Sequence, residues 1–485
     1  MFFLAILPFV LFVGLLFVGR LKILTASFVS LLLSALLAFF YWQMNFSLIL
    51  SALLKGGLIA FDIFLIVFGA IFFISLLKKV NVIQNLCFYL ETFSKDLRVQ
   101  VILLAWFLEN FLEGTSGFGT PSTVVAPILV GLGLSPIPAV AIALLGNSAS
   151  VVFGAAGTPI RIGFSGLDIS QIPYYSGLFN IIGSLVPVFM LFAITFRKEN
   201  WKERFFEALP FAIFVGLAYS IPAFFVTYLG QEFPSIIGSI VGLAIVLLAI
   251  RLKFLVPKNL MLSEKREPVD VKLSVGKVIF PYLLLVTLLI LGKFALGNIG
   301  FSFNFGLTHK FSLFNPGVIF ILTSVVFFLF WKKHLSKARE IVKDSFKRSL
   351  EPFFIIAPMS ALAQIMINSG QDDVLAQGLK TAALPLISPV LGAFGSFMTG
   401  SATLSNIMFG GILAKAAVDV GAASAIILSL ELVGAAAGNM VSLADILPAM
   451  AVVGIKGKER EVLKRVVIPC LIYVTLVGIL GFLVV

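Results

Sequence analysis

Long apolar runs are the feature that most constrains this sequence. Many of them reach the roughly 18–20 residues that a helix needs to cross a bilayer. Hydrophobic residues make up 60% of the 485 residues and charged residues only 12%. That is too little charge for the surface of a soluble protein of this size and too many apolar residues for a disordered chain. We therefore predict an all-α polytopic membrane protein that lies in a lipid bilayer.

The basic residues are concentrated in a few connections. Residues 332–348 and 251–277 carry seven Lys or Arg each and 456–465 carry five, whereas 229–235 and 369–379 carry none. The net charge of +12 then reflects cytoplasmic loops, which retain basic residues, and we expect no nucleic-acid partner. This scheme predicts about twelve crossings, a cytoplasmic linker at 251–277 between halves 1–250 and 278–485, and an external loop with Asp372 and Asp373.

Several kinds of chemistry lack the residues they would need. There are only two cysteines, Cys87 and Cys470, both histidines (His309 and His334) fall in predicted connections, and no Walker A motif occurs. We therefore expect no metal, no cofactor and no enzyme activity. The segment 1–19 lacks a basic start and a small-residue cleavage site, so we expect a first spanning helix and not a removed signal.

Two regions, 108–163 and 394–446, break the apolar pattern in the same order. In each, a helix ends in a Gly/Thr/Ser cluster, a short helix and a turn follow, and the next helix ends in a Gly/Ala-rich break. The loop charges place the start of 99–113 inside and the start of 382–399 outside, so we predict two inverted repeats, each with broken helices or a re-entrant hairpin. Such repeats are typical of secondary transporters, whose sites form where the half-helices meet.

The breaks predict an anion site. Glycines allow the backbone to unwind, and the pairs Thr120-Pro121 and Thr158-Pro159 restart helices whose free N–H groups attract negative charge. Arg161 follows the second restart and either binds a carboxylate or extends to the membrane interface. The alternative for the whole pattern is close packing of small residues between helices. The substrate-binding candidates are Gly114, Thr115, Ser116, Gly117, Thr120, Asn147, Thr158, Arg161, Thr399, Gly400, Ser401, Thr403, Asn406 and Asn439.

Acidic residues inside apolar runs are candidates for carrying a proton. Glu113 directly precedes the first glycine break and shares a helix face with Glu109. Glu113 either carries a proton or caps the break by accepting N–H bonds. Glu431 and Asp445 are the corresponding candidates in the second region, whereas Asp62 fits a structural hydrogen bond equally well and Lys415 receives no role.

Three strings carry a resemblance to a known family. The string Leu-Glu-Gly-Thr-Ser-Gly-Phe-Gly-Thr-Pro-Ser from residue 112, Val-Phe-Gly-Ala-Ala-Gly-Thr-Pro-Ile at 152–160, and Thr-Gly-Ser-Ala-Thr-Leu-Ser-Asn-Ile-Met-Phe-Gly from 399 are similar to those of the bacterial L-lactate permease family. The resemblance covers most of the chain. It implies uptake of lactate or glycolate with protons across the bacterial inner membrane, an elevator-like scaffold and transport domain, and a homodimer.

The sequence departs from the family pattern at three positions. Ala402 stands where the family usually has Asp, Asn439 where it usually has Lys, and Glu431 where Asn is more frequent. Loss of an acid and a base together fits removal of an ion pair, because one unpaired buried charge would be costly.

We predict a proton-coupled symporter of a small organic monocarboxylate. The alternatives are sodium coupling through unwound carbonyls and Asn side chains, a membrane-embedded enzyme, which is disfavoured because no metal-ligand cluster occurs, and a passive channel, which would need more polar helix faces.

Overall fold

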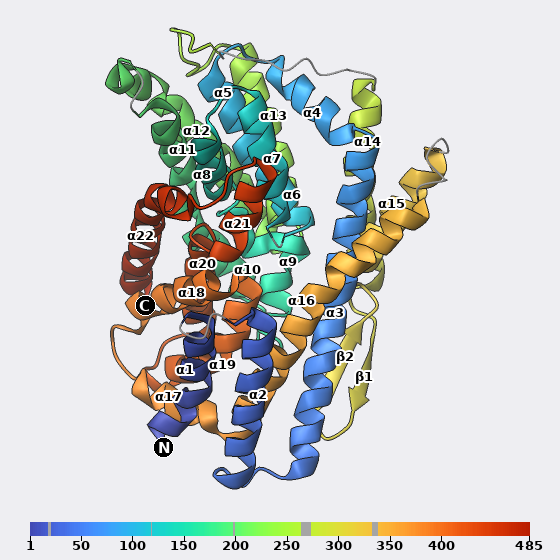
Figure 1. Ribbon diagram of the computed structural model, residues 1–485, viewed down its shortest axis with the longest axis vertical. Coiled ribbons are helices and arrows are strands. Elements are labelled where there is room, and N and C mark those ends of the chain that lie inside the picture. The colour runs from blue at the N-terminus through green and yellow to red at the C-terminus, as the bar shows by residue number, and fades with distance from the viewer. Residues whose placement is uncertain (18–20, 118, 197–198, 263–272, 332–337) are drawn as a thin grey trace.

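The computed structural model describes the chain except for residues 18–20, 118, 197–198, 263–272 and 332–337. The residues outside this description include Phe118 of the glycine motif and parts of the predicted basic connections 251–277 and 332–348. The described chain is almost entirely helical, as predicted (Figure 1).

The first 251 residues form helices and the two broken-helix segments of the first region. The elements before that region are α1 (Phe2–Phe17), α2 (Ile23–Phe40), α3 (Phe46–Lys79) and α4 (Val82–Glu91). The region itself contains α5 (Leu97–Ile102), the π-helix η1 (Leu103–Leu108), α6 (Glu109–Thr115), α7 (Thr120–Gly131), α8 (Pro136–Gly146), η2 (Ser150–Phe153) and α9 (Gly154–Arg161). After it come α10 (Ile172–Phe179), η3 (Asn180–Leu185), α11 (Val186–Thr195), α12 (Trp201–Val226), η4 (Thr227–Leu229) and α13 (Pro234–Arg251).

The remaining chain contains a strand pair and the second broken region. It comprises α14 (Val275–Leu296), β1 (Gly300–Asn304), β2 (Thr308–Ser312), α15 (Pro316–Phe330), α16 (Ala338–Ser369), α17 (Gln371–Gly378), α18 (Leu384–Thr399), α19 (Ala402–Asp419), α20 (Ser424–Asn439), α21 (Leu443–Val452) and α22 (Glu459–Val484). The antiparallel hairpin β1–β2 was not expected from the sequence. It joins α14 to α15 and pairs Phe303 with His309.

Nine helical segments within the described residues are long and apolar enough to cross a membrane, or ten if the bent pair α8 and η2–α9 is one span. Four further apolar helices, α1, α7, α15 and α18, are 10–17 residues long. The prediction of membrane-spanning helices is therefore confirmed, and the number of about twelve crossings stays a prediction.

Small residues bring the long helices into close contact. A Cβ atom added to Gly56 of α3 would fall on Ala361 of α16, and one added to Gly69 of α3 would fall on the Gly317 carbonyl of α15. Association inside a bilayer depends on such packing, because lipid is as apolar as the side chains that it would replace. Helices α3, α15 and α16 thus form one packed group.

The two broken regions have the same order of elements. In each, a helix (α6 or α18) is followed by a break, a helix (α7 or α19), a tight turn, a helix (α8 or α20), a second break and a last short helix (α9 or α21). The labels α7 and α8 lie in the upper half of Figure 1, whereas α18 and α19 lie in the lower half. The predicted turn near Asp419–Gly421 is present, since α19 ends at Asp419 and Gly421 has a φ of +75°.

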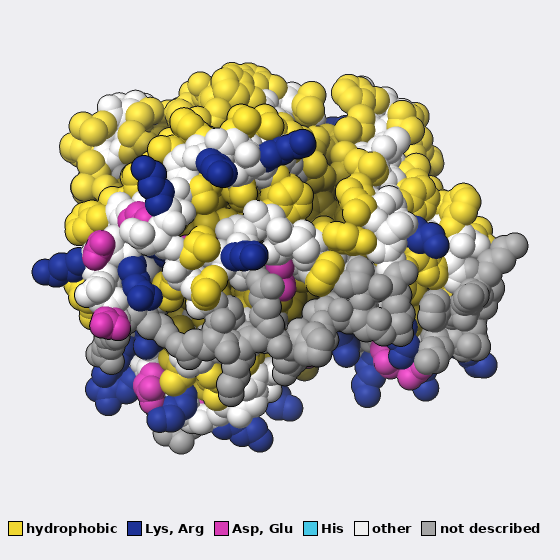
Figure 2. All heavy atoms as spheres, turned by 90° about the horizontal axis from the view of Figure 1, so that it is seen from above, with side chains coloured by type: hydrophobic (Ala, Val, Ile, Leu, Met, Phe, Trp, Pro, Cys, Tyr) yellow, Lys and Arg dark blue, Asp and Glu magenta, His cyan; other side chains and the backbone are white. Residues whose placement is uncertain are grey.

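Most of the described basic connections lie toward the upper end of Figure 1. The end of α13, the start of α12 and the start of α16 are there, whereas the β1–β2 tip and α17, with Asp372 and Asp373, lie at the lower end. Figure 2, seen from above, shows Lys and Arg side chains spread over this upper face and along one of its edges, with hydrophobic side chains mainly along the opposite edge. We call it the basic end.

A buried charge network holds the basic end together. Arg98, at the start of α5, is 0% exposed and its Nη2 atom lies 2.7 Å from Oδ2 of Asp96. Its guanidinium also donates to the carboxylate of Glu207 in α12 and to the carbonyl of Asn259, beyond α13. Burial of a charge is tolerated when it is paired and fully hydrogen-bonded. The network therefore ties the start of the first broken region to the segment that follows α13.

The charge distribution gives a test of topology. A cysteine replacing Glu340, which is exposed near the start of α16, should react only with a reagent that reaches the cytoplasm, and one replacing Asp373 should react from outside. The two native cysteines are buried and should give little background. Labelling of intact cells with a membrane-impermeant maleimide checks this, and the reverse pattern would contradict both the topology and the inverted repeat.

Candidate functional site

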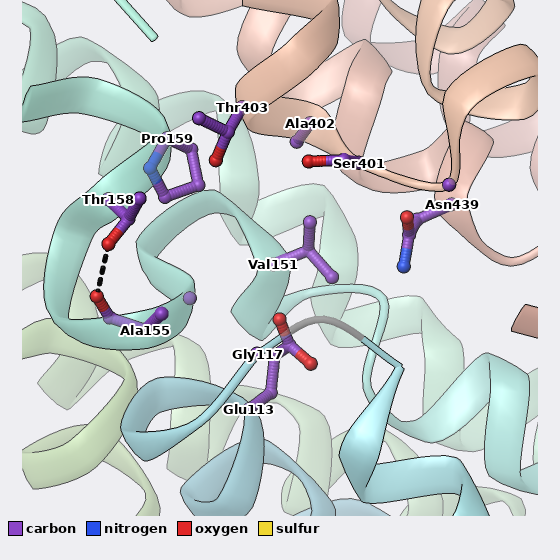
Figure 3. Close-up of a pocket in the computed structure, with 12 residues that line it drawn as sticks. Glu113, Gly117, Val151, Ala155, Thr158, Pro159, Ser401, Ala402, Thr403 and Asn439 are labelled. Atoms are coloured by element: carbon purple, nitrogen blue, oxygen red, sulfur yellow. Dashed lines mark hydrogen bonds between the residues drawn. The ribbon is translucent and has the colours of Figure 1, made fainter. Parts of the chain in front are cut away.

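The two broken regions meet at one pocket (Figure 3). The space within the pocket and at its mouth is about 310 Å³. Seven of its twelve lining residues come from the first region and five from the second: Glu113, Gly117, Val151, Gly154, Ala155, Thr158, Pro159, Gly400, Ser401, Ala402, Thr403 and Asn439. Seven of these residues were site candidates from the sequence, and none of the twelve is Lys, Arg or His.

Positive backbone angles form the first break. Gly117 and Gly119 have φ values of +58° and +68°, which glycine adopts without steric cost. The chain then restarts as α7 at the Thr-Pro pair, as predicted, but the N-cap residue is Gly119 and Thr120 already lies in the first turn with Pro121. The break places the end of α6, with Glu113, at the wall of the pocket.

The left-handed stretch Ala155–Gly157 was missed by sequence reasoning. Its φ values are +43°, +51° and +76°, although alanine rarely adopts this conformation. Non-glycine residues in this region cost free energy and cluster at functional sites. The stretch positions Ala155 and Thr158 on the pocket, and the Thr158 hydroxyl donates to the Ala155 carbonyl at 2.6 Å. The Gly-Ala-Ala-Gly string was the available signal, because small side chains are what such a turn tolerates.

The second region supplies hydroxyl and amide groups from the opposite wall. Gly400 has a φ of +72°, and the Ser401 hydroxyl caps α19 by accepting from the N–H of Leu404 at 3.4 Å. Figure 3 shows Ser401, Thr403 and Asn439 on one side of the pocket and the Glu113 carboxyl pointing toward them from the other. The wall therefore offers neutral donors only.

Glu113 is the carboxylate of the pocket. It is 4% exposed, and the Asn147 side chain lies next to it. Asp445 of α21 is the acidic group whose charge acts on it, and this residue also touches the first region, because a Cβ on Gly119 would fall on the Asp445 carboxylate. Asn147 and Asp445 thus belong to the surroundings of Glu113 although neither lines the pocket.

Several predicted residues bond to their own helices. The Thr115 and Ser116 hydroxyls both donate to the Leu112 carbonyl, and Thr399 donates to the Gly395 carbonyl. Gly114 packs against Ser235 of α13. Thr120 lies in the first turn of α7 and is not part of the lining. These residues shape the breaks without facing the pocket.

Asn406 links the two regions directly. Its Nδ2 atom donates to the Pro159 carbonyl at 2.8 Å, so α19 of the second region holds α9 of the first. Asn406 lies on the wall of a neighbouring pocket, together with Ser360 and Gln364. It therefore separates the candidate site from this second pocket.

Glu431 and Arg161 lie away from the candidate site. Glu431 is 0% exposed and accepts a 2.8 Å hydrogen bond from the Ser405 hydroxyl, within the packing of α18, α19 and α20. Arg161 does not line the pocket: its Nη1 atom donates to the Phe314 carbonyl at 3.2 Å, and Glu232 and Asp62 are the acids whose charges act on it. Their predicted roles in coupling and binding stay predictions.

Asp62 and Lys415 also have partners. Asp62 lies 3.2 Å from Nε2 of His309 in the β-hairpin, which fits the structural reading of this residue. Lys415 lies 2.8 Å from Asp373 at the lower end of the molecule. Within the described residues, no group of three His, Cys, Asp or Glu side chains is arranged to hold a metal ion.

The membrane-spanning helices define a multi-pass membrane protein. The two breaks that face each other across the pocket give it a central site built from both broken regions. The sequence profile of the L-lactate permease family matches residues 1–304 and 295–485, and the chain belongs to this family. It is thus a membrane transporter, and its relatives are named as permeases and not as enzymes.

Two relatives illustrate the similarity. Glycolate permease GlcA of Escherichia coli is 28% identical over 539 aligned positions, which cover 99% of this chain and 94% of that protein. L-lactate permease of Bacillus subtilis is 25% identical, with 99% and 95% covered. Among solved structures, the YdaH transporter of Alcanivorax borkumensis matches with a TM-score of 0.48 and 11% identity, covering 87% of this chain and 84% of that one.

Gly400 offers a test of the break. Gly400→Ala and Gly421→Ala both place alanine at positive φ, so they share that strain, about 1–2 kcal/mol. A Cβ at 400 would also press on Ala444 and Ser442, whereas one at 421 would meet no atom within 4 Å. We expect the alanine at 400 to lower the unfolding midpoint further in a thermal assay in detergent. Equal shifts would show that the break is loosely packed.

Proposed function

We propose that this chain is a secondary active transporter of a small organic monocarboxylate, such as L-lactate or glycolate, coupled to protons. The observation that carries the proposal is the pocket between the two breaks, which combines neutral hydroxyl and amide donors with one buried carboxyl group, Glu113. The family and the names of the relatives supply the substrate class.

The charges in the pocket provide a mechanism for coupling. A bound monocarboxylate and an ionised Glu113 would be two negative charges in a buried space with no cation in its lining. Their repulsion favours anion binding to the form in which Glu113 is protonated. By linkage, a bound proton then raises the affinity for the anion and a bound anion raises the affinity for the proton. Substrate and proton would therefore cross together.

The arrangement of the two halves supports alternating access. The order of elements is repeated, and the first hairpin (α7 and α8) lies in the upper half of Figure 1, opposite α18 and α19. Both features fit inverted repeats in 1–250 and 278–485, which the linker 251–277 joins. In this proposal the packed group of α3, α15 and α16 belongs to a scaffold, and the broken regions form a moving transport domain, as in an elevator. A homodimer in the cytoplasmic membrane of a bacterium completes the proposal.

Purified protein in liposomes tests substrate and coupling ion together. Uptake of labelled L-lactate should accelerate and become concentrative when the lumen is made alkaline, with no dependence on sodium. Stimulation by an inward sodium gradient alone would favour the sodium-coupled alternative. Lack of uptake of both lactate and glycolate would remove the proposed substrate class.

Glu113→Gln removes the titrating group while keeping the size of the side chain. We expect it to abolish accumulation driven by a pH gradient, because Gln cannot bind the proton, and to leave substrate exchange between the two sides of the membrane. Measuring both in the same liposomes separates coupling from binding. Accumulation at the wild-type level would transfer the role to Asp445 or Glu431.

Thr403→Val tests the donors of the second region. Loss of a hydroxyl that bonds a carboxylate should weaken binding by about 1.5 kcal/mol or more, roughly a tenfold rise in Kd. Thr323→Val is the matched control, because Thr323 is equally buried and its hydroxyl bonds within α15. Substrate-induced stabilisation against heat reports the Kd, and equal values for the two variants would remove Thr403 from the site.

A further inference from the structure

We infer that Glu109 is a second proton-binding residue, which receives the proton from Glu113 and passes it toward the basic end of the molecule. This inference rests on the proposed function, and it adds a residue that lies outside the pocket. Three kinds of observation carry it: the isolation of the Glu109 carboxyl, its position relative to Glu113, and the irregular helix that presents it.

The Glu109 carboxyl is buried without a partner. The residue is 0% exposed, and neither carboxylate oxygen has a hydrogen-bond partner among the described residues. A purely structural Glu would be expected to have found donors, because an unpaired buried carboxylate is costly. Ionisable groups that face the interior of a membrane protein in this way are typical of proton relays.

Glu109 lies one helical turn from Glu113 on the same face of α6. Four residues correspond to about 6 Å along a helix axis. Because α5, η1 and α6 run from the basic end toward the pocket, Glu109 is the member of the pair nearer the basic end (Figure 1). Its carboxyl also lies against Gly146 of α8, where any Cβ would meet it. The glycine therefore leaves room for this side chain.

A π-helix precedes Glu109 directly. Residues Leu103–Leu108 form η1, and α6 begins at Glu109. Isolated π-helical turns are rare and occur frequently at functional sites, because they shift the side chains that follow. The Trp106 ring nitrogen within η1 and both polar atoms of Asn110 in α6 are buried and have no partner among the described residues. Buried polar groups are therefore also present beyond the pocket, on the part of η1 and α6 that precedes Glu113.

The groups around Glu109 favour a proton over a metal ion. The charged residue that acts on it is Glu113, which in turn faces Asp445 of α21 and interacts with Tyr219 of α12. Among the helices packed on α6, α7 and α8 contain no charged residue, α13 has Arg251 in its last turn, and α9 has Arg161, which bonds the Phe314 carbonyl. Asn147 is 1% exposed and lies beside Glu113. No group of three acids among the described side chains is arranged to hold a metal ion, whereas a single carboxyl is enough to bind a proton.

The proton is transferred from Glu113 to Glu109 in two steps. The proton on Glu109 first leaves toward water at the basic end, which leaves Glu109 as a carboxylate. The O–H bond of Glu113 then breaks and its proton forms an O–H bond on Glu109, directly or through one water. Glu113 becomes a carboxylate, which repels the bound monocarboxylate and promotes its release on the same side.

Two substitutions at Glu109 separate proton transfer from packing. Glu109→Gln keeps the shape of the side chain and removes the titrating group, whereas Glu109→Asp keeps the titrating group and shortens the side chain. We expect Gln to reduce accumulation driven by a pH gradient at least about tenfold, with exchange of labelled for unlabelled substrate at the wild-type rate. Asp should retain most of the accumulation. A packing role predicts the opposite order, with Asp the more damaging variant.

Asp372→Asn is the matched control, because Asp372 is a buried carboxyl, 4% exposed, in α17 at the opposite end. It should keep both accumulation and exchange. Infrared difference spectra on a pH change give a second readout, in which the Gln variant should lose one protonated-carboxyl band. Wild-type accumulation by Glu109→Gln would overturn the relay and leave the proposed function intact. Absence of pH-driven uptake by the wild-type protein would instead overturn the proposed function.

Discussion

Backbone that unwinds at membrane depth must be enclosed by protein, and the centre of this molecule is arranged around that requirement. Unpaired N–H and C=O groups are too costly to face lipid. The two broken regions therefore enclose each other: Asn406 of α19 donates to the Pro159 carbonyl, and the Asp445 carboxylate lies against Gly119. The pocket is the space that remains where the breaks meet. A pocket lined by residues of both breaks is thus a direct product of the constraint.

The sequence predicted the parts of the fold whose signals are local. Apolar length identifies spanning helices, and the Thr120-Pro121 pair marks a helix start, because Pro favours the first turn. At 154–157 the sequence predicted a break but not its left-handed conformation, since alanine disfavours that conformation and tertiary contacts must hold it. The strands Gly300–Asn304 and Thr308–Ser312 stabilise each other across a turn, which a search for spanning helices overlooks.

The candidate site was predicted only in part, because side-chain direction at a break depends on the unwound residues themselves. Thr115 and Thr403 look alike in sequence, yet the first bonds back to its own helix and the second lines the pocket. The same applies to Arg161, whose guanidinium bonds the Phe314 carbonyl at the start of α15. Glu113 was predictable because a carboxyl directly before a glycine break remains close to it in any phase of the helix.

The hydrogen bonds between the halves have a consequence for biosynthesis. Asn406 donates to the Pro159 carbonyl, Ser429 donates to the Ile172 carbonyl, and Tyr473 donates to the Asn180 side chain. Each of these acceptors in the first half is therefore bonded by a residue more than 240 positions later in the chain. While the ribosome is still making the second half, these groups have no native partner. The inserted N-terminal half must therefore remain in the membrane without these hydrogen bonds until synthesis of the second half ends.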